Sequence, residues 1–116
     1  MTNNTEINNR NLEFYTVAEI NECPDGERIF IEIGDEYYII FNIDGTFYAV
    51  ADLCSHDNGP LGDGEVEDHC VICPRHGARF DLKTGNAVTL PAVHGIHSYP
   101  VRVKDGIIEI GFPKTK

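Results

Sequence analysis

The chain has 116 residues, enough for one domain with a single modest core. Hydrophobic residues make up 41% and charged residues 24%, a composition typical of a folded protein rather than a disordered one. The formal net charge of -10 at pH 7 argues against nucleic acid or an anionic membrane as a partner, and favours a protein partner with a basic patch.

The first segment, 1–12, is rich in asparagine and threonine, so we expect a flexible tail there and a single domain over 13–113. The tail has neither the basic nor the apolar region of a secretion signal. The longest apolar stretch, around Tyr37 to Phe41, is far too short to cross a bilayer. These features predict a cytoplasmic protein with no membrane association, in which the four cysteines stay reduced and available to metal.

Short β-type segments separated by turns follow from Phe14 onward, and no segment has a convincing helical pattern. Residues 28–33 alternate, which places Ile29, Ile31 and Ile33 on one face of a strand. Another strand is predicted over 66–72. Three further pairs of strands each flank a turn that contains glycine: 37–43 and 46–51 around Asp44-Gly45, 79–82 and 87–90 around 83–86, and 99–103 and 107–110 around Asp105-Gly106. This pattern favours an all-β fold, a small antiparallel β-sandwich or barrel.

Cysteine and histidine recur together in two short motifs, Cys54-Ser-His56 and, sixteen residues later, Cys73-Pro-Arg-His76. Two thiolates and two imidazoles make a four-ligand metal site. Residues two apart in an extended segment point the same way, and Pro74 favours the turn that the longer motif needs. Glycines and prolines around both motifs predict irregular loops, whose N–H groups can point at cluster sulfurs.

The remaining cysteines and histidines fit ordinary structural positions better than ligand positions. Cys70 is three residues from Cys73, on the opposite face of a strand, and is predicted to be a buried thiol. Cys23 precedes a turn and is predicted to be an unpaired thiol. The other histidines, predicted to be surface residues, are His69, His94 and His97.

The order C-x-H…C-x-x-H resembles the Rieske pattern, which holds a [2Fe–2S] cluster with two cysteines on one iron and two histidines on the other. The similarity runs from about Phe14 to Phe112 and is most specific in the boxes 54–61 and 73–81. It looks like the small Rieske-type ferredoxins that serve bacterial aromatic-ring dioxygenases. Zinc remains an alternative for a Cys₂His₂ set, although zinc fingers usually present two cysteines and then two histidines.

The resemblance implies one [2Fe–2S] cluster in two loops at one end of the Rieske fold. Cys54 and Cys73 would bind one iron, and His56 and His76 the other. A third loop containing proline covers the cluster in the family, and Leu90-Pro91-Ala92 is at that position here.

The departures from the respiratory branch of the family are informative. In that branch each box has an extra cysteine, and a disulfide between the two joins the loops. The matching positions here are Gly59 and Arg75, so this disulfide cannot form. It also has two hydroxyl donors to the cluster, where this chain has Ala78 and Phe80. Carboxylates near the boxes should disfavour adding an electron, namely Asp57, Asp63, Glu65 and Asp68. We therefore expect a midpoint potential of roughly -150 mV, the low end of the Rieske range.

By this resemblance the chain is a soluble one-electron carrier, monomeric and not catalytic alone. It would pass electrons from a flavin-dependent NAD(P)H reductase to a terminal non-haem iron oxygenase, and both partners would dock near His56 and His76. Two other classes of function stay open. One is the small subunit of a nitrite-reductase-like complex or the ferredoxin of another redox system, and the other is a zinc-stabilised interaction domain.

Overall fold

The computed structural model describes residues 12–55, 57, 59–90, 92 and 94–113, so residues 1–11 of the expected tail lie outside it. Its elements, in chain order, are β1 (Leu12–Glu19), η1 (Ile20–Glu22), β2 (Arg28–Ile33), β3 (Glu36–Ile43), β4 (Thr46–Ala51), β5 (Val66–Glu67), β6 (Cys70–Ile72), β7 (Arg79–Asp81), β8 (Ser98–Tyr99), β9 (Val101–Lys104) and β10 (Ile107–Pro113). Within these ranges the only helical element is η1, a 3-10 turn, which confirms the all-β class. No helix of the described chain is long and apolar enough to span a membrane.

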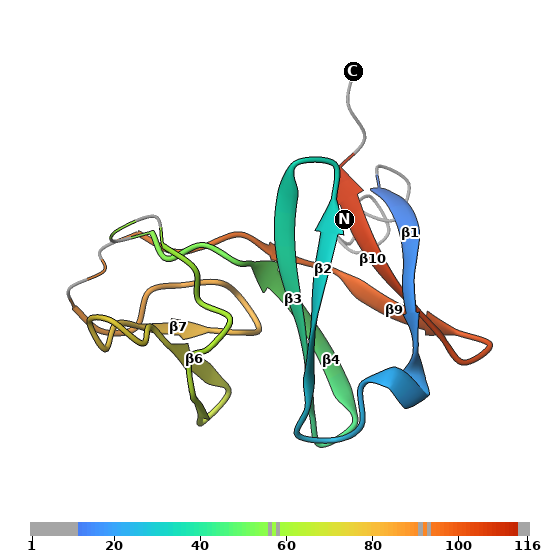
Figure 1. Cartoon of the computed structure of the whole chain (residues 1–116), viewed down its shortest axis with the longest axis horizontal. Coiled ribbons are helices and arrows are strands. Elements are labelled where there is room, and N and C mark those ends of the chain that lie inside the picture. The colour runs from blue at the N-terminus through green and yellow to red at the C-terminus, as the bar shows by residue number, and fades with distance from the viewer. Residues whose placement is uncertain (1–11, 56, 58, 91, 93, 114–116) are drawn as a thin grey trace, which may run out of the picture.

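The strands form three antiparallel sheets, in the orders β1-β10-β9, β2-β3-β4-β8 and β5-β6-β7. Figure 1 shows β6 and β7 in a lobe on one side of the β2-β3-β4 sheet, with β1, β9 and β10 on the other. The β2-β3-β4 sheet is therefore the middle layer, and the lobe beside it carries both cysteine–histidine motifs.

Strand β3 is apolar along most of its length because both of its faces are buried. Tyr38 and Ile40 face a core shared with β1 and β10, whereas Ile39 and Phe41 face a second core under the motifs. Alternate residues of a strand point to opposite faces, so a middle strand needs apolar side chains at successive positions. We call the second core the loop core; its buried members are Ile39, Phe41, Val50, Cys54, Leu61, Val71, Cys73, Ala78, Phe80, Leu82 and Ala92.

Two of the predicted hairpins form as expected. Asp44 and Gly45 have φ of 56° and 89°, and Asp105 and Gly106 have φ of 54° and 78°, as a tight two-residue turn requires. The isoleucines of β2 pack on the β1–β10 side of the sheet, on one face as predicted.

Two predicted strands are wrong. The segment 66–72 is not continuous, because Asp68 and His69 adopt positive φ (53° and 62°) and turn the chain between β5 and β6. The segment 87–90 is not a strand: Ala87 makes an isolated bridge to Phe80, and the N–H of Val88 donates to Arg79, but no ladder follows.

The predicted strand 99–103 is divided at Pro100. Tyr99 pairs with β4 in the middle sheet, whereas Val101 pairs with β10 in the outer sheet. Proline has no N–H to donate to a ladder, so it is suited to the point at which a strand changes sheets. This exchange ties the middle sheet to the outer sheet.

Candidate metal centre

The two cysteine–histidine motifs form loops that are closed in the same way. The N–H of Cys54 donates to the carbonyl oxygen of Gly59 at 2.7 Å, and the N–H of Cys73 donates to that of Ala78, also at 2.7 Å. In the second loop Gly77, at φ +78°, also donates to the carbonyl of Cys73, at 2.9 Å. Each cysteine therefore lies at the closed base of its loop, where the backbone is fixed.

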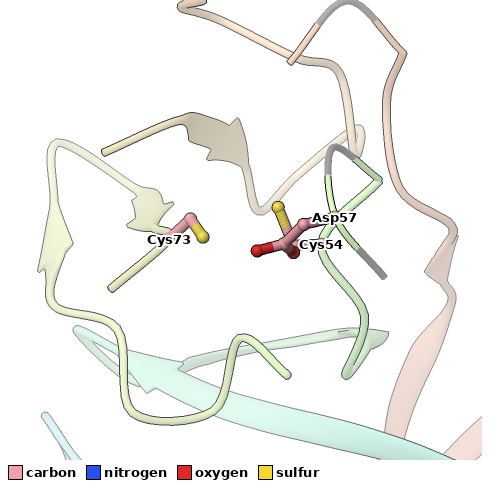
Figure 2. Close-up of side chains that lie close together, drawn as sticks. All are labelled: Cys54, Asp57 and Cys73. Atoms are coloured by element: carbon pink, nitrogen blue, oxygen red, sulfur yellow. The ribbon is translucent and has the colours of Figure 1, made fainter. Parts of the chain in front are cut away.

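Figure 2 shows the sulfurs of Cys54 and Cys73 in the space between the loops, with the Asp57 carboxylate beside them. The Sγ atoms of Cys54 and Cys73 and a carboxylate oxygen of Asp57 all lie within 4.8 Å of one another. Two sulfurs bound to one metal at about 2.3 Å each stand at most about 4.6 Å apart. The pair thus needs little movement to share one metal ion.

The cysteines lie in an apolar surrounding. Cys54 is 0% and Cys73 is 1% exposed. Leu61 and Phe80, both fully buried, belong to the loop core with them, and so does Ala92 from the third loop. The apolar walls shield the sulfurs from water on the side of the protein interior.

His76, in contrast to the two buried cysteines, has 40% of its side chain exposed. Its Nε2 is 3.0 Å from Oδ2 of Asp57. A ligating histidine commonly donates its second ring N–H to a carboxylate, and Asp57 is positioned for that role. The predicted ligand His56 and the predicted loop residue Pro91 lie outside the described residues.

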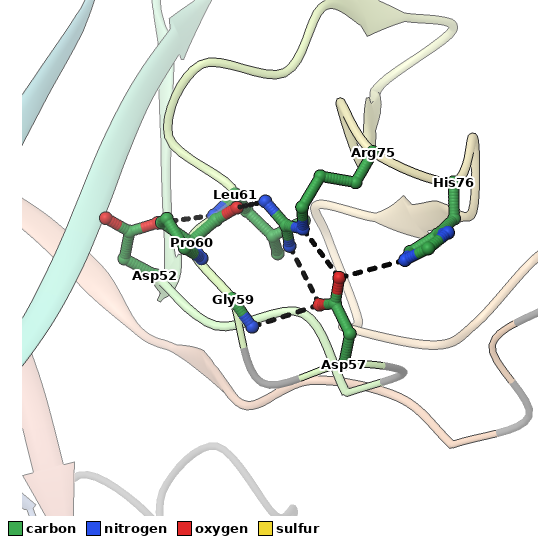
Figure 3. Close-up of polar contacts among 7 residues, drawn as sticks. All are labelled: Asp52, Asp57, Gly59, Pro60, Leu61, Arg75 and His76. Atoms are coloured by element: carbon green, nitrogen blue, oxygen red, sulfur yellow. Dashed lines mark hydrogen bonds and ion pairs between the residues drawn. The ribbon is translucent and has the colours of Figure 1, made fainter.

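An ion pair links the two loops (Figure 3). Arg75 donates from Nε to Oδ2 of Asp57 at 2.6 Å and from Nη2 to Oδ1 at 2.8 Å. Its third nitrogen, Nη1, donates to the carbonyl oxygen of Pro60 at 2.7 Å. Gly59 also donates its N–H to Asp57, at 3.0 Å. The guanidinium of Arg75, and secondly the N–H of Gly59, hold the pKa of the Asp57 carboxyl well below its usual range.

Two further side chains anchor the first loop to the middle sheet. Asp52, just after β4, accepts hydrogen bonds from the N–H groups of Leu61 and Gly62 at 2.7 and 2.9 Å. Arg28 of β2 donates to the carbonyl oxygens of Gly62 and Gly64 at 2.8 and 2.5 Å. The first loop is therefore held through its backbone by one residue of β2 and one residue that follows β4.

The sequence patterns did not identify the roles of Arg75, Asp52 and Arg28. A signal existed for Arg75, since an acidic residue follows His56 in one box and a basic residue precedes His76 in the other. No local signal existed for Arg28, which is 34 residues from Gly62 in the chain.

The other thiols and imidazoles do not join the site. None of the four cysteines, all of which are described, is in a disulfide. Cys23 is buried beside β3. Cys70 is half-buried rather than buried as predicted, because β6 begins there, directly after the two-residue turn. His94 and His97 are exposed, as predicted, whereas His69 is half-buried with its ring edge toward Tyr48.

The donors that the structure describes fit an iron–sulfur cluster. The two buried thiols lie within 4.8 Å of each other and of the Asp57 carboxylate, and the exposed imidazole of His76, from the second loop, lies 3.0 Å from that carboxylate. Cys54 and Cys73 could hold one iron, and His76, with His56 from the first loop, the other.

Comparison with known proteins agrees with this chemistry. The family model of the Rieske [2Fe-2S] domain matches residues 13–100. The 3-phenylpropionate/cinnamic acid dioxygenase ferredoxin subunit of Shigella flexneri is 40% identical over 98 residues, which cover 84% of this chain and 92% of that protein.

Solved structures show the same fold. The ferredoxin of carbazole 1,9a-dioxygenase from Nocardioides aromaticivorans has a TM-score of 0.80 at 27% identity, covering 87% of this chain and 98% of that one. A ferredoxin of Sphingomonas yanoikuyae has a TM-score of 0.79 at 30% identity, covering 87% and 100%. These matches confirm the predicted fold and the predicted cofactor, one Rieske-type cluster. The chain belongs to the Rieske [2Fe–2S] family and is built like the ferredoxins of that family.

Proposed function

We propose that this protein is a one-electron carrier of a multicomponent oxygenase, with no catalytic activity of its own. The observation that carries the proposal is that two buried cysteine sulfurs lie within 4.8 Å of each other, in a chain that the Rieske family model matches over 13–100. When bound, a Rieske cluster supplies reversible exchange of one electron. Because the cluster only exchanges an electron, a domain over 13–113 that holds it needs no substrate pocket beside the cluster.

The proposed ligands are Cys54 and Cys73 for one iron and His56 and His76 for the other. The closed loop bases fix the two cysteine backbones. The apolar loop core keeps water from the sulfurs, and the exposure of His76 gives a partner access to the imidazole side of the site. Electrons would enter and leave by that side.

The proposed partners are a flavin-dependent NAD(P)H reductase and a terminal non-haem iron oxygenase. The names of the curated relatives, which are dioxygenase ferredoxin subunits, support the oxygenase. We propose that both partners dock at the end of the molecule that carries His56 and His76, so that they compete for one surface. A monomer in the cytoplasm suits a carrier that alternates between two enzymes.

Electron paramagnetic resonance of the dithionite-reduced protein tests the proposal, with iron and acid-labile sulfide measured on the same sample. We expect about two irons and two sulfides per chain. The signal should be rhombic, with an average g below that of an all-cysteine [2Fe–2S] protein. Zinc without sulfide, from an anaerobic preparation with adequate iron, would instead identify a zinc-stabilised interaction domain.

Binding experiments test the carrier role separately from the cluster. Reductase and oxygenase should displace each other from the reduced or oxidised protein. Simultaneous tight binding of both would exclude a shared docking surface, and permanent association with a single large enzyme would favour the role of a subunit instead.

A further inference from the structure

We propose that Arg75 is a positioning residue whose guanidinium, held by Asp57, joins the two loops of the metal centre into one unit. This bridge would set how firmly the cluster is retained and at what potential it is reduced. The inference rests on the proposed function, because it concerns how the protein holds that cluster.

The contacts of Arg75 all run from the second loop to the first. Two of its nitrogens reach the carboxylate of Asp57, at 2.6 and 2.8 Å, and the third reaches the carbonyl oxygen of Pro60, at 2.7 Å. Paired charged hydrogen bonds of this geometry are stronger and more directional than neutral ones. They cross the space between the loops at a place where no disulfide joins them.

The first loop is shaped to receive the guanidinium. A Cβ atom at Gly59 would lie 2.6 Å from Nη2 and 2.7 Å from Cζ of Arg75. The lack of a side chain at Gly59 therefore allows the flat guanidinium to lie directly against the loop backbone. Lysine would keep the charge but could not reproduce three bonds in one plane.

The bridge also contacts the groups that define the centre. The Asp57 carboxylate lies within 4.8 Å of the sulfurs of Cys54 and Cys73, and its Oδ2 is 3.0 Å from Nε2 of His76. An unpaired carboxylate at this place would oppose the addition of an electron. The positive charge of Arg75 offsets it, so breaking the bridge alters both the position and the electrostatic field of the ligands.

Three variants separate position from charge. Arg75→Gln removes the bonds and the charge, Arg75→Lys keeps the charge alone, and Gly59→Ala displaces the guanidinium with every charge retained. The matched control is Arg79→Gln, which breaks a 2.6 Å ion pair with Glu67 in the same lobe. For each variant we would measure the rate of cluster loss in a chelator, the midpoint potential, the EPR line shape and the folded state by circular dichroism.

All three variants should lose the cluster about 10-fold or more faster than the wild type, as when the partner of a metal ligand is removed. Arg75→Gln should also have a lower potential, because the Asp57 charge is no longer offset. Arg75→Lys should keep a potential near that of the wild type, with an altered EPR line shape. The control should match the wild type in every measurement.

Wild-type rates of cluster loss and wild-type EPR line shapes in folded Arg75→Lys and Gly59→Ala would overturn the proposed bridge. Wild-type protein that holds neither iron nor sulfide would overturn the proposed function first, and the bridge with it. The two failures are distinguished by the metal content of the wild type before any variant is compared.

Discussion

Cys54 and Cys73 occupy equivalent positions in two loops of equal span. The N–H of each donates to the carbonyl oxygen of a residue five positions later, Gly59 or Ala78, and both bonds are 2.7 Å long. The repeated sequence motif thus corresponds to a repeated backbone closure. The two closed bases hold the cysteines where their sulfurs lie within 4.8 Å of each other.

Cys54→Ser and Cys73→Ser should each abolish cluster assembly, because each removes one of the two converging thiolates. Iron and acid-labile sulfide in the purified protein should fall to background. Cys70→Ser is the matched control, since Cys70 lies in the same lobe but outside the group of converging donors. A full complement of iron and sulfide in either of the first two variants would contradict the proposed ligand set.

The midpoint potential should be close to the low end of the Rieske range, roughly -150 mV. Ala78 and Phe80 line the loop core with no hydroxyl to donate to the sulfurs, and Asp63 and Glu65 line a hollow beside Cys73. Asp57 contributes less than the sequence implied, because Arg75 neutralises it. A midpoint potential well above zero in a redox titration would contradict this explanation.

Ala78→Ser tests the same reasoning in the opposite direction. A hydroxyl beside Cys73 could donate to a sulfur and stabilise the reduced, more negative state. A gain of about 1.4 kcal/mol, within the range of a typical intramolecular hydrogen bond, raises the potential by about 59 mV for one electron. An unchanged potential with the cluster intact would show that the hydroxyl donor is not what separates this chain from the respiratory branch.

Local sequence was sufficient for the elements that depend on local chemistry. The hairpin at Asp44-Gly45 follows from residues that tolerate positive φ, and the alternation of β2 follows from a strand with one buried face. The repeated pairing of cysteine with histidine, at 54–56 and 73–76, predicted a metal centre because these residue types at these spacings are typical of metal ligands.

The errors arose where a turn has no glycine to mark it, or where distant contacts decide the structure. The turn at Asp68 and His69 has no glycine, so the apolar residues on either side looked like one strand. The change of sheets at Pro100 depends on the pairing of Tyr99 with β4, which is far away in the chain. The bonds of Arg75 to Asp57 likewise depend on how two loops meet, which no spacing rule describes.

Arg28→Ala should destabilise the domain by about 2–4 kcal/mol, because two hydrogen bonds from a charged donor are lost. Arg28 joins β2 to the carbonyls of Gly62 and Gly64, and so holds the lobe to the middle sheet. Urea unfolding followed by circular dichroism measures the change. Lys104→Ala, at an exposed site in β9, should change the free energy of unfolding by less than about 0.5 kcal/mol.

The thiol of Cys23 should be unreactive in the native protein. Its side chain is fully buried, and burial raises its pKa, so the reactive thiolate is scarce. Burial also raises the pKa of Cys70, but that side chain is half-exposed. Alkylation at pH 8, followed by mass spectrometry of peptides, should label Cys70 first. Equal labelling of both would contradict the packing around Cys23.

The raised pKa of Cys23 also predicts a dependence of stability on pH. Above the pKa of the unfolded thiol, about 8.5, the unfolded chain binds fewer protons than the folded one. The contribution of the neutral thiol is therefore complete below that pH and is lost as the pH rises toward the folded pKa. The free energy of unfolding should fall more steeply between pH 8 and 10 in the wild type than in Cys23→Ala. Parallel slopes would contradict the shift.

Electron transfer to the oxygenase should slow as salt is added, because a protein of net charge -10 attracts a basic docking surface over long range. Asp63 and Glu65 lie beside Cys73, whereas Asp105 lies in the β9–β10 turn on the opposite side of the molecule (Figure 1). If steering acts at the cluster end, Asp63→Asn with Glu65→Gln should lower the rate at low salt and flatten its salt dependence. Asp105→Asn should leave both unchanged. A wild-type rate that ignores salt would mean that the acidic surface serves solubility rather than docking.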